Sequence, residues 1–245
     1  QNLVEMEYAV RGAIPRRAQE MQRAGRTIYA CNLGNPQALG QKPITFYRQV
    51  LTLLEAAGNI TRERSLARVA AANPELFNES GVEPIANYII DYSANFLEQC
   101  RTGMGAYTES KGPLFIRTAI ARYIDRRDGE NIAADPEQIF LTDGASDAVK
   151  RIMELLITGP KDGVMIPIPQ YPLYSATVKR CGGVQVNYYP EEDNDWTLTP
   201  DILEEAYRKA TADGVHVKCI VVINPGNPTG AILDKPSIDG VVNFA

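Results

Sequence analysis

The sequence CIVVINPGNPTGAIL, residues 219–233, leads an apolar run directly into a turn that contains two Asn-Pro pairs. Residues 220–223 are all β-branched, which is typical of a strand buried on both faces of a parallel sheet. The prolines and glycines after Asn224 predict a stiff turn that needs no ladder hydrogen bonds. Because such a turn leaves little entropy to lose on binding, we interpret it as aiming the Asn227 amide at an anionic oxygen. A structural asparagine turn without a ligand is the alternative.

Strands of this kind alternate with helices in the second half of the chain. Short runs rich in apolar and β-branched residues occur at 138–142, 163–168, 184–189 and 216–223. Helical patterns lie between these runs, at 146–157, near 171–179 and at 201–210. Thr199 is the expected cap of the last helix, and Pro200 suits its first turn. This alternation predicts an α/β fold, a mostly parallel sheet with helices on both faces.

The first part of the chain has a mainly helical pattern with loop interruptions. Residues 44–56 place their apolar side chains on one helical stripe, and residues 113–129 form a second amphipathic pattern that ends in glycine. We therefore expect an N-terminal arm and helical segment over residues 1–100 that contributes to a small domain. Residues 101–245 are expected to form the first part of a large domain.

Composition and charge favour a globular protein with small-molecule partners. The chain has 245 residues and a net charge of −5, with Lys and Arg dispersed among acidic residues, whereas a nucleic-acid-binding surface needs clustered cations. No apolar run approaches the ~20 residues that span a bilayer. We therefore expect neither nucleic acid nor a membrane as a partner.

Cysteine and histidine usage argues against metal and disulfide chemistry. The four cysteines, Cys31, Cys100, Cys181 and Cys219, are too far apart for a Cys-x-x-Cys zinc motif. The single histidine, His216, has no Cys or His directly beside it in the sequence. We expect no metal site and reduced cysteines, in the cytoplasm or alternatively in the mitochondrial matrix.

Two earlier strand ends carry candidate ligand-binding residues, because ligands of open α/β sheets lie beyond the carboxyl ends of the strands. The small residues at 143–145 would leave backbone N–H groups open to a phosphate, with the Ser146 hydroxyl as a further donor. Alternatively, Ser146 only caps the helix. After residues 163–168, the prolines direct Tyr171 and Tyr174 to the same rim. An aromatic ring there could stack on a flat ligand or serve only in packing.

Five stretches of the sequence carry a resemblance to a known family: NLGNPQALGQKPITFYRQVL, GAYTESKGPLFIRTAIARYIDRRDG, DGASDAV, PIPQYPLYSA and NPGNPTG. Together they resemble the alanine aminotransferases, which are fold-type I, pyridoxal 5′-phosphate-dependent enzymes, over nearly the whole chain from Val10 to Ala245. The Asn-Pro-x-Asn-Pro-Thr-Gly motif marks the aminotransferase superfamily. NPQALGQKPITF and PIPQYPLY are narrower signals, which glutamate:glyoxylate aminotransferases share.

The resemblance implies a fold-type I large domain and the reaction of L-alanine with 2-oxoglutarate to give pyruvate and L-glutamate. Glutamate:glyoxylate or another class I/II aminotransferase is the alternative. A nucleotide-binding α/β domain is disfavoured because neither a Gly-x-Gly-x-x-Gly nor a P-loop motif follows any expected strand.

The same resemblance implies roles for individual cofactor-binding residues. The N–H of Ala145 and the side chain of Ser146 would hold the phosphate of pyridoxal 5′-phosphate. Tyr171 would stack on the pyridine ring, and Asn227 would bind the phenolic O3′ and lie near the substrate carboxylate.

Two further residues are implied to act outside this group. Tyr107 would reach the cofactor phosphate of the neighbouring subunit, so that a homodimer is expected; packing of this tyrosine within its own subunit is the alternative. The backbone of Gly34 would lie against the amino acid or 2-oxo acid substrate.

The family's catalytic residues follow the Asn-Pro-x-Asn-Pro-Thr-Gly motif at some distance. They are the Schiff-base lysine, an aspartate near the pyridine nitrogen and an arginine for the substrate carboxylate, and this chain has none of the three. Lys111, Lys150 and Lys235 are poor substitutes, since a Schiff-base lysine must be desolvated and placed at the cofactor carbonyl. We therefore expect a truncated aminotransferase that is inactive by itself. A non-catalytic dimerising fragment is the alternative.

Overall fold

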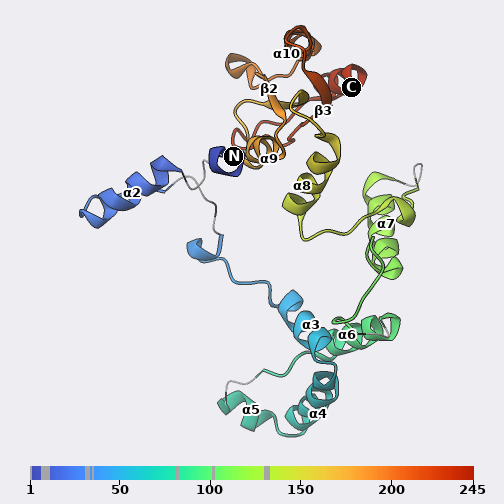
Figure 1. Ribbon diagram of the computed structural model, residues 1–245. Helices are drawn as coiled ribbons and strands as arrows, with labels where there is room; N and C mark the ends of the chain where they lie inside the picture. Colours follow the sequence, from blue (N-terminus) through green and yellow to red (C-terminus); the bar gives the residue numbers. More distant parts are fainter. Residues whose placement is uncertain are drawn as a thin grey trace. The chain divides into compact units, whose positions relative to one another are not determined.

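The computed structural model describes residues 2–6, 12–30, 34, 36–80, 83–100, 103–129 and 133–245. They belong to two compact units, which Figure 1 shows coloured along the sequence. One unit is Gly34–Leu141, and the other combines Gln1–Leu33 with Thr142–Ala245. The predicted boundary near residue 100 concerns the domains of the whole protein, and it stays a prediction.

The unit Gly34–Leu141 is helical. Its elements are η2 (Pro36–Leu39), α3 (Thr45–Glu55), α4 (Gly58–Ala72), α5 (Pro74–Ser80), α6 (Asn87–Gln99), α7 (Leu114–Asp128) and η3 (Pro136–Gln138). The helices predicted at 44–56 and 113–129 are confirmed as α3 and α7.

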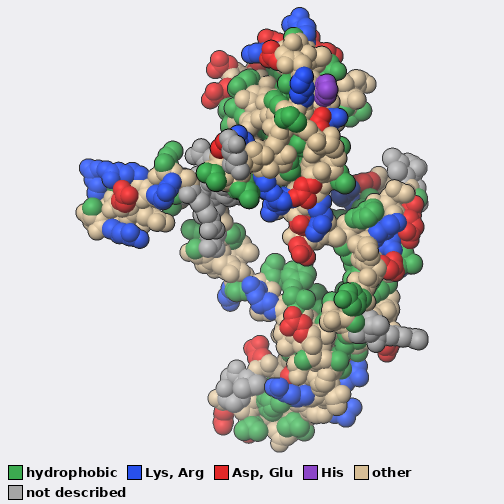
Figure 2. Space-filling view, in the orientation of Figure 1, with side chains coloured by type: hydrophobic (Ala, Val, Ile, Leu, Met, Phe, Trp, Pro, Cys, Tyr) green, Lys and Arg blue, Asp and Glu red, His purple; other side chains and the backbone are tan. Residues whose placement is uncertain are grey.

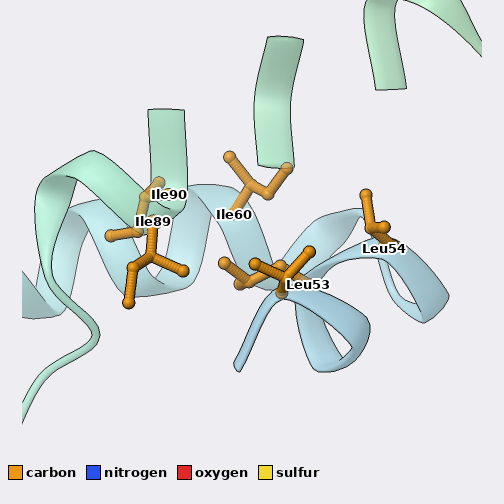
Figure 3. Close-up of a cluster of buried hydrophobic side chains, with 6 residues drawn as sticks. Leu53, Leu54, Ile60, Ile89 and Ile90 are labelled. Atoms are coloured by element: carbon orange, nitrogen blue, oxygen red, sulfur yellow. The ribbon is translucent and has the colours of Figure 1, made fainter. Parts of the chain in front are cut away.

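The core of this unit is the apolar cluster between α3, α4 and α6 (Figure 3). Residues spaced three or four apart on a helix lie on one face, and this spacing brings Val50, Leu53 and Leu54 of α3 together. Their partners are Ile60 of α4 and Ile89 and Ile90 of α6. Leu53 and Ile90 are completely buried, so burial of this stripe drives the association of the helices.

The second unit contains a three-stranded sheet in the order β2-β1-β3. The strands β1 (Asp162–Pro167), β2 (Val184–Tyr188) and β3 (His216–Ile220) are all parallel. Every residue of the central strand β1 is buried, as the continuous apolar run predicts for a strand covered on both faces.

Helices cover both faces of this sheet. Val164 and Ile166 of β1 face the cluster that includes residues of α8 (Ala145–Leu156) and α9 (Leu173–Cys181). Met165 faces the opposite cluster, with residues of α10 (Pro200–Ala212) and α11 (Lys235–Phe244). Successive strand residues point to opposite faces, so β1 contributes side chains to both halves of the core. The predicted α/β architecture is confirmed.

Three further elements belong to this unit. They are α1 (Asn2–Glu5), α2 (Ala13–Arg23) and η4 (Glu192–Asn194). Glu5 of α1 forms an ion pair with Lys179 of α9 at 2.6 Å. No residue of α2 is buried, and Figure 2 shows Lys and Arg side chains gathered over this helix.

Three local predictions need correction. The strand predicted at 138–142 is wrong: η3 ends at Gln138, and the structure assigns no strand to the residues that follow. A strand requires a partner for its backbone groups, and here the Leu141 N–H donates only to the Lys111 carbonyl, at 2.9 Å. The strand predicted to reach residue 223 ends at Ile220. Thr199 precedes α10, but its side chain makes no capping hydrogen bond.

Three of the cysteines, Cys100, Cys181 and Cys219, are free thiols, and Cys31 lies outside the described residues. Burial raises the pKa of the Cys181 and Cys219 thiols. Among the residues that the structure describes, no group of His, Cys, Asp and Glu could hold a metal ion. None of the described helices combines the length and the apolar composition needed to cross a bilayer.

Candidate functional site

The turn after β3 closes on itself. The Gly226 N–H donates to the Ala231 carbonyl at 2.7 Å, and the Gly230 N–H donates to the Gly226 carbonyl at 2.8 Å. A Cβ at position 226 would lie 2.4 Å from the Thr229 Oγ1, so a larger residue there would require the Thr229 side chain to move. Gly230 has a φ of +74°, which also favours glycine. The stiff turn predicted from the sequence is therefore present, and both of its Asn-Pro bonds are cis.

The two asparagines of the turn have different surroundings. The Asn224 Oδ1 accepts a hydrogen bond from the Leu233 N–H at 3.1 Å. Asn227 is exposed, and its side chain makes no hydrogen bond to any residue that the structure describes. The Asn224 side chain therefore has its oxygen engaged within the turn, whereas the whole Asn227 amide is unengaged by the described residues.

The amino end of α8 forms the second part of the candidate site. Gly144, with a φ of +89°, is the N-cap, and its carbonyl accepts hydrogen bonds from the N–H groups of Asp147 at 3.1 Å and Ala148 at 3.3 Å. The interpretation of Ser146 as the helix cap is therefore wrong, because Ser146 is the second residue of α8. The first-turn N–H groups of Ala145 and Ser146 lie at the positive end of the helix dipole.

Two basic side chains lie in the cavity beside Ser146, and one of them, Arg180, is paired with Glu154. Ser146 and Lys150 line a cavity of about 250 Å³ together with residues of α9, among them Thr177 and Arg180. The one acidic side chain in the first turn of α8, Asp147, is paired with Arg151 at 2.8 Å. This hydrogen bond lowers the pKa of the Asp147 carboxyl, and the pairing offsets its repulsion of an anion.

Tyr171 and Tyr174 follow β1 and have separate roles. Tyr171 is partly buried between the cis Ile168-Pro169 bond and α9, and its carbonyl accepts from the Tyr174 N–H at 3.4 Å. The Tyr174 side chain packs against the core under α8 and α9. The packing interpretation therefore holds for Tyr174, whereas stacking by Tyr171 on a ligand stays a prediction.

The topology brings two of the candidate residues to one edge of the sheet. Tyr171 follows the carboxyl end of β1 and Asn227 that of β3, and these strands are parallel neighbours. Asn227 lines a small pocket of about 40 Å³, whereas Ser146 lines the separate cavity beside α9. A common ligand for Ser146, Tyr171 and Asn227 stays a prediction.

The sequence interpretation missed Trp196. This residue lines the same small pocket as Asn227, together with Tyr188 and Pro167, and has a left-handed φ of +61°. The sequence signal was that the chain's one tryptophan follows a run of acidic residues and Asn, which favours a turn.

Tyr107 and Gly34 both belong to the unit Gly34–Leu141. Tyr107 is fully exposed and lines an open groove with Glu109, Phe115 and Arg122. This exposure argues against packing of Tyr107 within residues 34–141. Gly34 is exposed as well.

Three lysines, Lys111, Lys150 and Lys235, are candidates for a covalent bond to the cofactor, and their surroundings do not fit this role. The Lys111 Nζ donates to the Glu137 carbonyl at 2.9 Å and to its carboxylate at 3.0 Å. Lys235 is paired with Asp239 at 2.6 Å and has a side chain that is 83% exposed. Lys150 lies in the Ser146 cavity but is only partly buried.

Comparison with known proteins adds an independent finding. Residues 69–245 match the family model described as aminotransferase class I and II. Glutamate–glyoxylate aminotransferase 2 of Arabidopsis thaliana is 41% identical over 245 residues, which are 100% of this chain and 47% of that protein. Mitochondrial alanine aminotransferase 1 of the same plant is 41% identical over 251 residues, covering 99% of this chain and 43% of that protein.

The fold is also similar to a solved structure. An alanine aminotransferase from Pyrococcus furiosus superposes with a TM-score of 0.67 and 22% identity, over 100% of this chain and 48% of that one. At this identity the likeness shows the fold alone. The chain spans less than half the length of each of these proteins.

Proposed function

The chain belongs to the class I and II aminotransferases, and from this premise we propose that the whole protein transfers an amino group from L-alanine to 2-oxoglutarate, giving pyruvate and L-glutamate. The observation that carries this proposal is the unengaged Asn227 amide on a self-closed turn, next to the strand end that precedes Tyr171. A fixed donor of this kind stabilises negative charge without reorganisation.

Within this proposal the cofactor is pyridoxal 5′-phosphate, and the residues present fit its chemistry. The N–H groups of Ala145 and Ser146 and the Ser146 hydroxyl hold the phosphate at the amino end of α8. Tyr171 stacks on the ring, and Asn227 donates to the phenolic oxygen. The exposure of the helix end and the free Asn227 amide support this fit.

When bound, pyridoxal 5′-phosphate supplies an electron sink and carries the nitrogen between the two half-reactions. The chain's own residues would orient the cofactor ring and stabilise its negative charge. Asn227 offsets charge on the phenolic oxygen, and the phosphate contacts hold the ring in register for proton transfer. We assign the covalent role to none of Lys111, Lys150 and Lys235, since the first and last are paired with carboxylates and Lys150 is only partly buried.

The proposed partners are amino acid and 2-oxo acid substrates and a second copy of the protein. Tyr107 contacts the cofactor phosphate of the neighbouring subunit, and its full exposure supports this role. Gly34 lies against the substrate. We propose a cytoplasmic location, with the mitochondrial matrix as the alternative, since one similar alanine aminotransferase is named mitochondrial.

An assay of the full-length protein tests the proposal. With pyridoxal 5′-phosphate, L-alanine and 2-oxoglutarate, we expect pyruvate and glutamate to form in equal amounts, and activity to be lost when the cofactor is removed. The 245-residue chain alone is expected to show no turnover under the same conditions. Absence of transamination in the full-length protein with any amino donor and 2-oxo acid would overturn the function.

A second candidate is glutamate:glyoxylate transamination. The 41% identity to an Arabidopsis thaliana enzyme of that name equals the identity to the alanine aminotransferase, so identity does not separate the two substrate pairs. Formation of glycine from L-glutamate and glyoxylate, without pyruvate formation from L-alanine and 2-oxoglutarate, would select this second candidate.

A further inference from the structure

The two asparagines of the turn after β3 are chemically identical, but the fold uses them differently. The Asn224 side chain is engaged within the turn, whereas the Asn227 side chain is not. We propose that Asn224 is a positioning residue that holds the turn in the shape that presents the Asn227 amide to its ligand. This inference rests on the proposed function of Asn227.

The hydrogen bond between Asn224 and Leu233 closes the base of the turn, where the chain enters and leaves it. The Leu233 backbone N–H can only donate, so it is the side-chain oxygen of Asn224 that accepts, at 3.1 Å. The two residues are nine positions apart, and Asn227 lies on the segment between them. The hydrogen bond therefore sets the distance between the outgoing and the returning backbone.

Hydrogen bonds between residues closer in the sequence close the tip of the same turn, residues 226–231. The hydrogen bonds of the Gly226 and Gly230 N–H groups stay within residues 226–231, and the Thr229 Oγ1 accepts from the Ala231 N–H at 3.3 Å. These bonds make the tip a compact unit, but none of them reaches the sheet. The hydrogen bonds that connect the tip to the rest of the unit therefore lie at its base.

Both ends of the turn are anchored to the core. The Val221 N–H donates to the Met165 carbonyl of β1 at 2.9 Å, and the Val221 carbonyl accepts from the Tyr188 hydroxyl at 2.7 Å. The returning segment is held by the Leu233 side chain, which packs against the core that contains Met165. Among these described contacts, only the Asn224 hydrogen bond joins the two anchored ends directly.

The expected consequence of losing this bond is a displaced Asn227 amide. Displacements near 1 Å in positioning groups cost up to about a hundredfold in rate. Asn224 itself touches no ligand in this proposal, so it acts through Asn227. Its effect should appear in kcat and in the cofactor spectrum more than in KM.

The test compares four variants of the full-length protein. Asn224→Ala removes the acceptor, Asn224→Asp keeps an acceptor oxygen, and Asn227→Ala removes the ligand-facing amide. Asn73→Ala is the matched control, because Asn73 is an exposed asparagine whose side chain also makes one hydrogen bond to backbone, with Val69 at 3.0 Å. The readouts are hydrogen exchange of the Leu233 N–H in the cofactor-free protein, the visible absorbance of bound pyridoxal 5′-phosphate against pH, and kcat and KM.

We expect Leu233 exchange to rise about tenfold in Asn224→Ala. The midpoint of the absorbance change should shift in the same direction as in Asn227→Ala, and kcat should fall roughly 10- to 100-fold. Asn224→Asp should recover most of the exchange protection and of kcat. Asn73→Ala should match the wild type in every readout.

Two negative outcomes are distinguishable. If Asn227→Ala alters the spectrum and kcat but Asn224→Ala behaves like Asn73→Ala, the positioning inference is wrong and the proposed function stands. If Asn227→Ala has no effect, the proposed role of Asn227 is wrong and the role of Asn224 is wrong with it. Should Asn224→Ala not fold, Asn224→Gln replaces it, because the added methylene displaces the same amide from Leu233.

Discussion

At the scale of single residues, the Asp162 carboxyl gives a measurable prediction for how stability depends on pH. Asp162 is buried at the amino end of β1, whereas Asn227 follows the carboxyl end of the neighbouring strand β3. Its Oδ2 accepts from the Thr158 hydroxyl and N–H, both at 2.8 Å, and from the Gly159 N–H at 2.9 Å. The Lys218 ammonium lies 3.2 Å from the Oδ1. The Thr158 hydrogen bonds, assisted by Lys218, lower the pKa of Asp162 from 3.8 to about 2.

This pKa predicts how stability depends on pH. Because the folded pKa lies below the unfolded value, the ionised carboxyl stabilises the fold above about pH 4, and this contribution is lost as the pH falls to about 2. Asp162→Asn should therefore lower the urea midpoint at pH 7, and the difference from wild type should shrink between pH 4 and pH 2. Asp193→Asn changes an exposed carboxyl and serves as the control. An Asp162→Asn difference that does not change with pH would contradict this account.

At the scale of secondary-structure elements, Arg117 ties α7 to the segment that carries Tyr107. Its side chain is 1% exposed, and it donates to the carbonyls of Gly112 at 2.8 Å and Pro136 at 2.7 Å. It also pairs with Glu109 at 2.6 Å and Glu137 at 3.2 Å. Because a buried guanidinium must be paired and hydrogen-bonded, these contacts hold α7, the chain after Tyr107 and η3 together.

Arg117→Met should therefore lower the melting temperature by about 5 °C or more, since it removes a donor to two part-buried backbone carbonyls and the partner of two carboxylates. Arg117→Lys should recover only part of the loss, because an ammonium cannot reproduce the forked geometry of guanidinium. Arg127→Met is the control: Arg127 is exposed, its one ion pair with a described residue is to its neighbour Asp128, and exposed pairs contribute little. Equal melting temperatures for Arg117→Met and Arg127→Met would show that the buried network does not stabilise the unit.

At the scale of the whole molecule, the proposed homodimer predicts complementation between subunits. In the full-length protein, Tyr107→Ala and Ser146→Ala would each inactivate the site to which the altered residue contributes. If Tyr107 acts across the interface, a mixed dimer has one site with both defects and one intact site. After refolding an equal mixture, about a quarter of wild-type activity should return, because half of the dimers are mixed and half of their sites are intact.

A second mixture repeats the test with a different residue of the same site. Tyr107→Ala mixed with Asn227→Ala should recover the same quarter of the activity, because Asn227 and Ser146 belong to the same subunit's site. Mixtures that stay as inactive as the separate variants would contradict a shared site, and Tyr107 would then act within its own subunit.

The sequence by itself determined the elements that depend on local chemistry. Helical spacing of apolar residues was enough for α3 and α7, the helix-start residues before 201–210 indicated α10, and runs rich in apolar and β-branched residues were enough for the three parallel strands. The two Asn-Pro pairs and their glycines were enough for a stiff turn beyond β3. These features follow from backbone and side-chain preferences within a few residues, so each can be predicted without knowledge of the rest of the chain.

Only the tertiary structure decided what depends on distant partners. The run at 138–142 has strand-like residues, but a strand requires a partner strand. Its described backbone hydrogen bonds are local ones, apart from a single bond from the Leu141 N–H to the Lys111 carbonyl. Asn224 and Asn227 are equivalent in the sequence, and the approach of the Leu233 N–H distinguishes them. Gly144, and not Ser146, caps α8 because the Gly144 carbonyl receives the first-turn N–H groups. In each case the folded path of the backbone determines which acceptor comes within hydrogen-bonding distance of a given N–H group.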